Sequence, residues 1–324
     1  MSPRACTVSL NPAIDRTLWV EALAPGHTHL ATAEHRQAGG KGFNVAAGLA
    51  SLGVPVAMCG WLGEANCGAF EAAFQARGIV DAMDRVPGHI RENLQLTDSA
   101  RQQTTSIDLP GIAFDPAMLA DAEGRLSRTL AARVTAGDWC LLTGSLPPGV
   151  DAGTLERLSR QLAAAGARLV VDTGGEALAD LLRRLAGTPE ALPVFVKPNR
   201  DELAALCGRA LPTVSDVVAA ARDVVARGVP HVLVSLGVDG AVLVTAAGAW
   251  TCAAPAVPIC TTVGAGDAVV AGATAALMAG LPFDAAARHG LACAAWRIQR
   301  RTPDLPPRDV LDADAAAYRL IPSP

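Results

Sequence analysis

The stretch AGGKGFNVAAGLASLGVPVAMCG, from Ala38 to Gly60, places a glycine-rich turn, a helix and a strand in direct succession. Glycines surround Lys41, and the alanine-rich pattern after it predicts a helix over Asn44–Leu52. Gly53 ends that helix, and the apolar run Val54–Gly60 predicts a strand. A turn, a helix and a strand within so few residues are typical of an α/β fold.

The same alternation of strand and helix patterns continues along the chain. Short apolar, β-branched runs predict further strands at Ala5–Leu10, Trp139–Thr143, Arg168–Asp172, Val194–Lys197, His231–Leu236 and Ala241–Thr245. Longer alanine-rich patterns predict further helices at Gly68–Arg77, Pro116–Val134, Asp151–Ala165, Glu176–Leu185, Arg200–Cys207, Val214–Arg227, Asp267–Ala279 and Phe283–Gln299. Strands that are almost continuously apolar predict a doubly wound, mostly parallel sheet with helices on both faces.

Two segments are more polar than the rest of the chain. Arg16–Gln37 and His89–Leu109 contain period-2 patches, such as Asn93-Leu94-Gln95-Leu96-Thr97, and predict a small, half-exposed sheet. No linker separates these segments from their neighbours. We therefore expect one domain over residues 1–324, with lid segments at about 12–38 and 88–110.

The composition excludes several classes of protein. Hydrophobic residues make up 51% and charged residues 18% of the chain, which indicates a packed globular protein. The formal net charge is −4 and the chain has no basic tract, so nucleic acid is not an expected partner. The eight cysteines show neither CxxC nor zinc-type Cys/His spacing, so we expect buried free thiols in a reducing compartment.

One uncharged stretch is long enough to cross a bilayer. Val45–Gly63 has 19 residues without a charge, but glycines and Pro55 divide it into a helix, a turn and a strand. The apolar run Cys6–Leu10 is too short and too polar for a signal peptide. The sequence therefore predicts a cytoplasmic protein with no membrane partner.

Ligands of open α/β sheets bind in the loops that follow the strands, and the loop Thr262–Asp267 is unusual. Its sequence TVGAGD leads into a helix, and its two glycines let successive N–H groups form an anion site at the helix start. Asp267 places a carboxylate beside that site, although an acidic residue in a first helical turn also stabilises the helix by itself. The segment half-matches the dinucleotide fingerprint GxGxxG, but Val269 occupies the sixth position.

The turn around Lys41 predicts a second anion site. Lys41 and Lys197 are the only lysines in the sequence, while the other 25 of the 27 cationic side chains are arginine. Both lysines fall in loops that follow predicted strands or precede helices. A compact ammonium with three donors among glycines indicates a lysine selected for its geometry. The turn is not a Walker A loop, because GxxxxGK[ST] is absent.

Two further loops have both a structural and a functional interpretation. In Lys197-Pro198-Asn199-Arg200-Asp201-Glu202, Asn199 and Glu202 form the pattern of a capping box. The same two side chains suit water-mediated binding of Mg²⁺. Leu142–Gly149 is either a rigid turn or a ligand loop. Two anion sites, a carboxylate and a candidate magnesium loop together predict phosphoryl transfer.

These motifs resemble the ribokinase-like sugar kinases of the phosphofructokinase B group. The resemblance covers about residues 5–310 and rests on six motifs in the same order, namely Asn11–Asp15, Ala38–Ala46, Gly144–Gly149, Lys197–Glu202, Ser235–Gly240 and Thr262–Asp267. It implies a ribokinase-like fold with a small β lid, ATP and Mg²⁺ as cofactors, and a homodimer formed through the lid. The chain is most similar to the branch that includes 1-phosphofructokinases and tagatose-6-phosphate kinases.

The resemblance also implies an activity. It is the ATP-dependent phosphorylation of a ketohexose phosphate, with fructose 1-phosphate favoured and tagatose 6-phosphate and fructose 6-phosphate as alternatives. A non-catalytic sensor of nucleotide or sugar phosphate is an alternative of another class, but a sensor has no need of the carboxylate at Asp267. A dinucleotide oxidoreductase is disfavoured by Val269.

Site residues are carried over by the matching motif positions. Asp267 would be the catalytic base, and the backbone N–H groups of Gly264, Ala265 and Gly266 would stabilise the transferred phosphoryl group. The phosphorylated sugar would be bound by Asp15, Gly39, Gly40, Lys41, Asn44, Arg91, Asn93 and Ser145, with Lys41 holding the phosphate already present. The nucleotide would be bound by Lys197, Asn199, Ser235, Gly237, Gly240 and Gly266, and magnesium by Asn199 and Glu202 through water.

Two positions depart from the pattern of the family. Ala268 stands where this branch more often has serine, and Arg301-Thr302-Pro303 stands where a Gly-Thr pair is expected. The second departure concerns the loop on the adenine side and any potassium site near it. Neither departure touches the base or the glycine turn.

Overall fold

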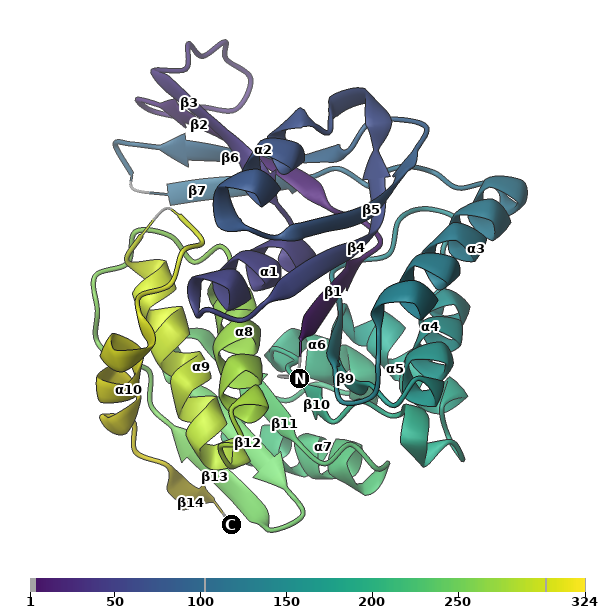
Figure 1. Ribbon diagram of the computed structural model, residues 1–324. Helices are drawn as coiled ribbons and strands as arrows, with labels where there is room; N and C mark the ends of the chain where they lie inside the picture. Colours follow the sequence, from purple (N-terminus) through teal and green to yellow (C-terminus); the bar gives the residue numbers. More distant parts are fainter. Residues whose placement is uncertain (1–3, 102, 301, 324) are drawn as a thin grey trace.

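The computed structural model describes residues 4–101, 103–300 and 302–323, and Figure 1 shows their arrangement. Its main layer is a ten-stranded sheet. In spatial order its strands are β14 (Ile321–Ser323), β13 (Gly248–Cys252), β12 (Ala241–Thr245), β11 (Val232–Ser235), β10 (Phe195–Val196), β9 (Arg168–Asp172), β8 (Trp139–Thr143), β1 (Ala5–Ser9), β4 (Val56–Gly63) and β5 (Val80–Val86). The strands from β11 to β5 are parallel, whereas β12, β13 and β14 pair antiparallel at one edge.

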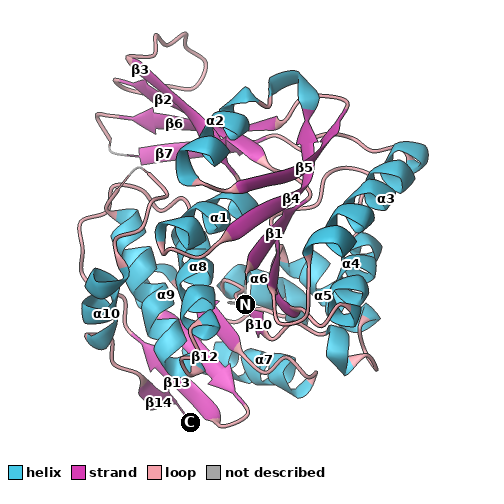
Figure 2. Ribbon diagram, viewed as in Figure 1, coloured by secondary structure: helices cyan, strands magenta, loops and turns pink. Residues whose placement is uncertain are grey.

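Helices cover both faces of this sheet (Figure 2). One face packs against α3 (Pro116–Arg133), α4 (Ala152–Ala164), α5 (Gly175–Arg184), α6 (Arg200–Cys207) and α7 (Val214–Ala226). The other face packs against α1 (Lys41–Ser51), α2 (Gly68–Arg77), α8 (Ala265–Met278), α9 (Phe283–Ile298) and α10 (Arg308–Ala316). Successive strand residues alternate between these two cores, so Leu141 and Leu142 are both buried but on opposite faces. The predicted doubly wound, mostly parallel α/β fold is confirmed.

A second sheet stands beside the main one and contains both of the polar segments (Figure 1). Its order is β3 (Ala33–Gly39), β2 (Ala13–Val20), β6 (Arg91–Asp98) and β7 (Gln103–Asp108). The central strands β2 and β6 are parallel, and their register sets Asp15 beside Asn93. This sheet lies where the sequence predicts a lid. Its action as a lid, and the single domain over residues 1–324, stay predictions.

Several elements differ from their predicted bounds. The helix predicted from Asn44 begins at Lys41, and the helix predicted from Asp267 begins at Ala265, because Gly40 and Gly264 provide the turns before them. Strand β4 extends to Gly63. These shifts place Lys41 and Asp267 in first helical turns, where backbone N–H groups lack helical partners.

Four elements were not predicted, namely β5, β13, β14 and α10. Strand β5 reads VDAMDRV, and its charges are tolerated because it is an edge strand and partly exposed. Strand β14 contains Pro322 and lies at the other edge, where a missing N–H costs little. Short 3₁₀ turns occur at Glu64–Asn66, Pro189–Ala191 and Gly237–Asp239.

The eight cysteines are free thiols. Cys6, Cys59, Cys140, Cys252 and Cys293 are buried, while Cys260 is exposed, so burial is confirmed for most of the thiols but not all. Among the described residues, no helix is both long and apolar enough to cross a bilayer. Arg301, in the departing Arg301-Thr302-Pro303 segment, lies outside the described residues.

Candidate active site

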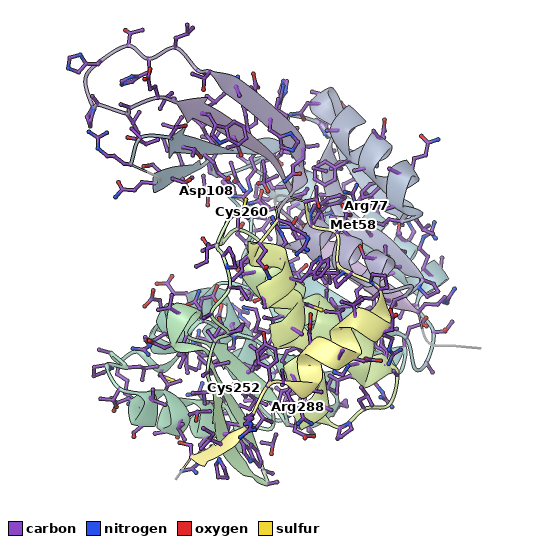
Figure 3. The ribbon with its side chains drawn as sticks, turned by 90° about the vertical axis from the view of Figure 1, so that its left-hand side faces the viewer. Met58, Arg77, Asp108, Cys252, Cys260 and Arg288 are labelled. Carbon is purple, nitrogen blue, oxygen red and sulfur yellow. The ribbon has the colours of Figure 1, made fainter. Side chains whose placement is uncertain are left out.

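The loops that follow the parallel strands converge at the carboxyl ends of these strands, on the side of the main sheet that faces the second sheet. This arrangement is expected for a doubly wound fold. They surround a cavity of about 500 Å³. Figure 3 shows Asp108, on β7, and Cys260, in the loop before α8, at the junction of the two parts. The cavity is lined by Asp15, Gly40, Lys41, Asn44, Arg91, Asn93, Gln95, Ser106, Asp108, Gly144, Ser145, Lys197, Asn199, Glu202, Ser235, Val263, Gly264, Gly266 and Asp267.

Asp267 lies in the first turn of α8 and is only 6% exposed. Its Oδ2 accepts a hydrogen bond of 2.8 Å from Asn44 Nδ2, which fixes the carboxylate relative to α1. Burial and the nearby Asp172 carboxylate raise the pKa of Asp267 to about 6, against the opposing effects of Lys41, the Asn44 hydrogen bond and Lys197. A carboxylate with this pKa is ionised at neutral pH and is a stronger base than an exposed aspartate.

The glycine turn before α8 lies at the cavity, where the sequence predicts an anion site. Gly264 is the N-cap and has φ of +79°, a left-handed conformation that glycine adopts without strain. Gly264 and Gly266 line the cavity, whereas the Ala265 N–H donates to the Thr262 carbonyl at 3.3 Å. The positive end of the α8 dipole therefore lies beside the Asp267 carboxylate.

Asp15 forms the centre of a polar group on the second sheet. It is 6% exposed and accepts a hydrogen bond of 3.1 Å from Asn93 Nδ2. Burial raises the pKa of Asp15, against the effects of Asn93 and Arg91. Gly39 does not line the cavity, but a Cβ there would lie 2.2 Å from Asp15 Oδ2. Glycine at position 39 is therefore what makes room for the Asp15 carboxylate.

The loop after β8 reaches the same side of the cavity. The Asn11 amide donates to Ser145 Oγ at 3.1 Å and to the Pro110 carbonyl at 3.0 Å, which ties this loop to the segment after β7. Ser145 lines the cavity as predicted. The loop Leu142–Gly149 is thus both a turn and part of the cavity wall.

Arg91 is the cation on this side of the cavity. It opens strand β6 opposite Ala13, and its Nη1 donates to the Leu109 carbonyl at 3.0 Å. Its Nε is buried without a hydrogen-bond partner among the described residues. Burial lowers the pKa of Arg91, against the effects of Asp108 and Asp15. Arg91 lines the cavity, and a guanidinium at a cavity wall suits an anionic ligand.

A network of lysines and carboxylates lies where α1 and α6 begin and β9 ends. Lys41 Nζ lies 3.2 Å from Glu202 Oε1 and 3.4 Å from Asp172 Oδ1, and Lys197 Nζ lies 3.5 Å from the same Asp172 oxygen. Burial disfavours the Lys41 charge, but the carboxylates of Asp172 and Glu202 raise the pKa of Lys41 overall. The buried Oδ2 of Asp172 has no hydrogen-bond partner within the described chain.

Asn199 and Glu202 confirm the capping-box interpretation of their loop, while the binding of Mg²⁺ stays a prediction. They form a complete capping box at the start of α6, with hydrogen bonds of 2.8 and 2.9 Å. Both also line the cavity, and Asn199 pairs with Ser235 across a short parallel bridge. Gly237 begins the 3₁₀ turn beyond Ser235 and Gly240 is its C-cap, and neither residue lines the cavity.

Several lining or adjacent residues were not predicted. Asp172 ends β9, and its place at the carboxyl end of a predicted strand is a signal that could have revealed it. Gln95, Ser106 and Asp108 belong to the second sheet, where alternation alone does not show which side chains face the cavity. Arg297 approaches Gly264 from α9, and no sequence motif marks it.

Comparison with known proteins identifies the class of protein that this fold and cavity define. The chain belongs to the pfkB family of carbohydrate kinases, whose family model matches residues 5–309.

Individual relatives are more specific. The chain is 43% identical over 278 residues to the 1-phosphofructokinase of Xanthomonas campestris, covering 86% of this chain and 85% of that one. It is 42% identical to the 1-phosphofructokinase of Rhodobacter capsulatus, covering 97% and 96% of the two chains. Among solved structures, phosphofructokinase-2 from Escherichia coli in complex with fructose 6-phosphate is 28% identical, with a TM-score of 0.85 over 97% of this chain and 98% of that one.

Proposed function

We propose that this carbohydrate kinase transfers a phosphoryl group from ATP to fructose 1-phosphate, giving fructose 1,6-bisphosphate and ADP. The observation that carries the proposal is the buried Asp267 carboxylate beside the glycine turn, in a cavity that the Arg91 guanidinium also lines. Relatives named 1-phosphofructokinase over nearly the full chain support the choice of substrate.

The residues suggest a division of labour in the transfer. Asp267 accepts the proton of the sugar hydroxyl while the oxygen of that hydroxyl bonds to the γ-phosphorus of ATP. The bond between the γ-phosphorus and the β–γ bridging oxygen breaks, and ADP leaves with its electrons. The N–H groups at Gly264 and Gly266 face the charge that develops on the transferred group. Asp15 and Asn93 orient the hydroxyls of the sugar, and Arg91 with Lys41 binds its phosphate.

The nucleotide side of the proposal rests on the second group of residues. Lys197, Asn199 and Ser235 line the cavity next to Gly266, where they can contact ATP phosphates. Gly237 and Gly240, which do not line the cavity, are proposed to support the loop beneath the nucleotide. Ala265 is proposed to contribute to the phosphoryl site through the start of α8 alone, since its N–H is paired.

Magnesium fits the carboxylates on the nucleotide side. The unpartnered Oδ2 of Asp172 and the Oε1 of Glu202 are hard oxygen donors, and Lys41 lies near both residues through Asp172 Oδ1 and Glu202 Oε1. Two carboxylates, with Asn199 nearby, suit an ion that keeps much of its water and binds substrate phosphates. When bound, Mg²⁺ neutralises phosphate charge and favours transfer. Asp172 joins the predicted Asn199 and Glu202 as a candidate for holding it.

Glu202→Gln is expected to raise the Mg²⁺ concentration for half-maximal activity by about tenfold, because one anionic donor is lost. Glutamine can still complete the capping box, so the start of α6 is preserved. Mg²⁺ titrations at fixed free ATP measure the effect. Glu176→Gln, which changes an exposed carboxylate in the first turn of α5, is the matched control. Equal Mg²⁺ requirements in both variants would show that Glu202 does not help to bind magnesium.

The pH dependence of kcat/KM follows from Asp267. Activity requires its ionised form, so kcat/KM is expected to rise with pH through a midpoint near 6, the raised pKa of Asp267. Initial rates from pH 4.5 to 8 at subsaturating sugar measure this limb. The control is the assay that detects ADP, which must respond linearly to added ADP at every pH without the protein. A midpoint near 4, the ordinary aspartate value, would show that the limb reports another group.

We further propose a cytoplasmic location and a homodimer that pairs through the second sheet. Support for the dimer comes from the exposed apolar side chains Leu30, Ile107 and Leu109 on or next to that sheet. A related phosphofructokinase-2 from Escherichia coli has a tetrameric inhibited form. Sedimentation of the purified protein tests the dimer.

An acceptor panel tests the proposed function directly. ADP release with Mg-ATP is compared for fructose 1-phosphate, fructose 6-phosphate, tagatose 6-phosphate and free fructose. The proposal expects the highest kcat/KM with fructose 1-phosphate. A higher value with another phosphosugar would change the substrate, and tight sugar-phosphate binding without turnover on any acceptor would favour the sensor.

A further inference from the structure

Arg297 is a buried cation that the proposed function does not use. It lies in the last turn of α9, one residue before the end of the helix, and is 4% exposed. Its Nη1 donates to the Arg300 carbonyl, and its Nε is buried with no hydrogen-bond partner among the described residues. The Asp304 carboxylate attracts the Arg297 charge, but its Oδ1 forms an ion pair of 3.1 Å with Arg77 Nε and not with Arg297. A buried guanidinium without a carboxylate partner is costly to the fold.

The guanidinium lies directly behind the glycine turn. A Cβ placed on Gly264 would be 3.2 Å from Arg297 Nε and 3.5 Å from its Nη2. Gly264 lines the cavity, whereas Arg297 is not among its lining residues. The adjacent backbone holds the same segment, since the N–H groups of Cys260 and Thr261 donate to the Ile298 carbonyl at 2.7 and 3.1 Å. The end of α9 therefore fixes the chain that leads into the turn.

The charge of Arg297 acts on the carboxylates of the cavity. Burial lowers the pKa of Arg297, against the attraction of Asp267, then Asp15, and then Asp304. Other groups also face Asp267. The polar and charged groups that face it from packed elements are Lys41 and Asn44 on α1, Asp172 on β9 and Lys197 after β10. Arg297 adds a cation from α9.

We propose that Arg297 is a positioning residue for phosphoryl transfer, which holds the Gly264 turn in place and adds a fixed positive charge behind the anion site. The guanidinium stabilises both the anionic form of Asp267 and the charge that collects at the turn during transfer. The inference rests on the proposed function for its kinetic consequences, but its effect on Asp267 does not need an acceptor.

Arg297→Met tests this role against Arg300→Met. Arg300 stands three residues later and stacks over Trp296, with its Cζ 3.4 Å from the ring centroid. Its substitution removes the same charge as Arg297→Met, but at a position outside the Gly264 turn. We expect Arg297→Met to lower kcat by about 10–10²-fold, because one fixed charge at the anion site is lost. The acidic limb of kcat/KM should move to higher pH, since removal of a cation raises the pKa of Asp267. Arg300→Met should change neither.

A carboxyl titration separates this inference from the proposed function. The ¹³C signal of the Asp267 carboxyl, assigned with Asp267→Asn, is followed against pH without any substrate. We expect its midpoint in Arg297→Met to lie about half a unit or more above that of the unmodified protein. If the unmodified protein turned over no acceptor, the proposed function would fail, while this titration would still test Arg297.

Other outcomes would overturn the inference. If Arg297→Met lowered the melting temperature but kept kcat, the pH limb and the carboxyl midpoint of the unmodified protein, Arg297 would be structural only. Arg297→Lys serves if the methionine variant does not fold, because lysine keeps the charge but loses the planar fork. We expect Arg297→Lys to keep the pH limb and to lower kcat, and an unchanged kcat in this variant would contradict a positioning role.

Discussion

Replacing Asp267 by asparagine is expected to lower kcat by about 10²–10⁴-fold, because the amide cannot accept the proton of the attacking hydroxyl. Asparagine has the same shape, and its carbonyl oxygen can still accept the hydrogen bond from Asn44. The KM for ATP should therefore stay close to its original value. Steady-state rates of ADP release at saturating ATP and sugar phosphate measure the effect.

The control for this variant is another buried aspartate. Asp138 is also 6% exposed, but it pairs with Arg4 at 3.1 Å in the turn before β8, away from the cavity. Asp138→Asn should lower the melting temperature and leave kcat within about threefold, since it weakens only the ion pair with Arg4 and the hydrogen bonds from Arg4 and Thr135. A kcat in Asp267→Asn that equals that of the unmodified protein would exclude Asp267 as the base.

Asp267→Asn also has an expected effect on stability. Because the pKa of Asp267 is raised in the folded protein, ionising this group above about pH 6 costs folding free energy. The neutral asparagine avoids that cost, so the variant should melt at a higher temperature than the unmodified protein at pH 8, and the difference should shrink as the pH falls below 6. This exchange of stability against activity is common at active sites.

Replacing Lys41 by methionine is expected to raise the KM for fructose 1-phosphate by about 10–10²-fold. This rise in KM corresponds to the loss of one or two charge-assisted hydrogen bonds to the sugar phosphate. The pKa of Lys41 is raised by Asp172 and Glu202, so the ammonium is charged across the working pH range. Its removal also leaves these two carboxylates without their shared cation. Kinetics at varied fructose 1-phosphate and saturating Mg-ATP measure the effect.

The comparison substrate for Lys41→Met is free fructose. Fructose has no phosphate, so any residual turnover with it should be lowered much less by the substitution. In the structure Lys41 lies on the side of Asp172 and Glu202, while Arg91 lies on the side of Asp15. A rise in the KM for ATP alone would therefore reverse the proposed assignment, with Lys41 serving the nucleotide and Arg91 alone serving the sugar phosphate.

Much of the fold was predictable because its signals are local. The helix after Lys41 and the strand that ends at Asp172 both follow from apolar runs and glycine breaks. The edge strands β5 and β14 escaped prediction because edge positions tolerate charge and proline, and both features mask a strand pattern. Helix bounds differed by two or three residues where glycine turns lead into α1 and α8.

The candidate site was predictable only where one loop carries its own chemistry. The turn Gly264–Asp267 contains a flexible backbone, a helix start and a carboxylate within one segment, so local reasoning reaches it. Asp172 and Arg297 depend on neighbours far away in the sequence, because strand order and helix packing bring them to Lys41 and Gly264. Their importance lies in buried charge without full pairing, which appears only once the chain is folded.

The most direct test of the central proposal is to identify the product. The purified protein is incubated with Mg-ATP and fructose 1-phosphate, and ³¹P NMR follows the sugar phosphates and ADP over time, with Asp267→Asn as the control. We predict loss of fructose 1-phosphate and equal formation of fructose 1,6-bisphosphate and ADP, with almost none of either in the control. Release of ADP and inorganic phosphate without a bisphosphate would contradict the proposal. So would the absence of any reaction with fructose 1-phosphate when the same protein consumes fructose 6-phosphate in a parallel incubation.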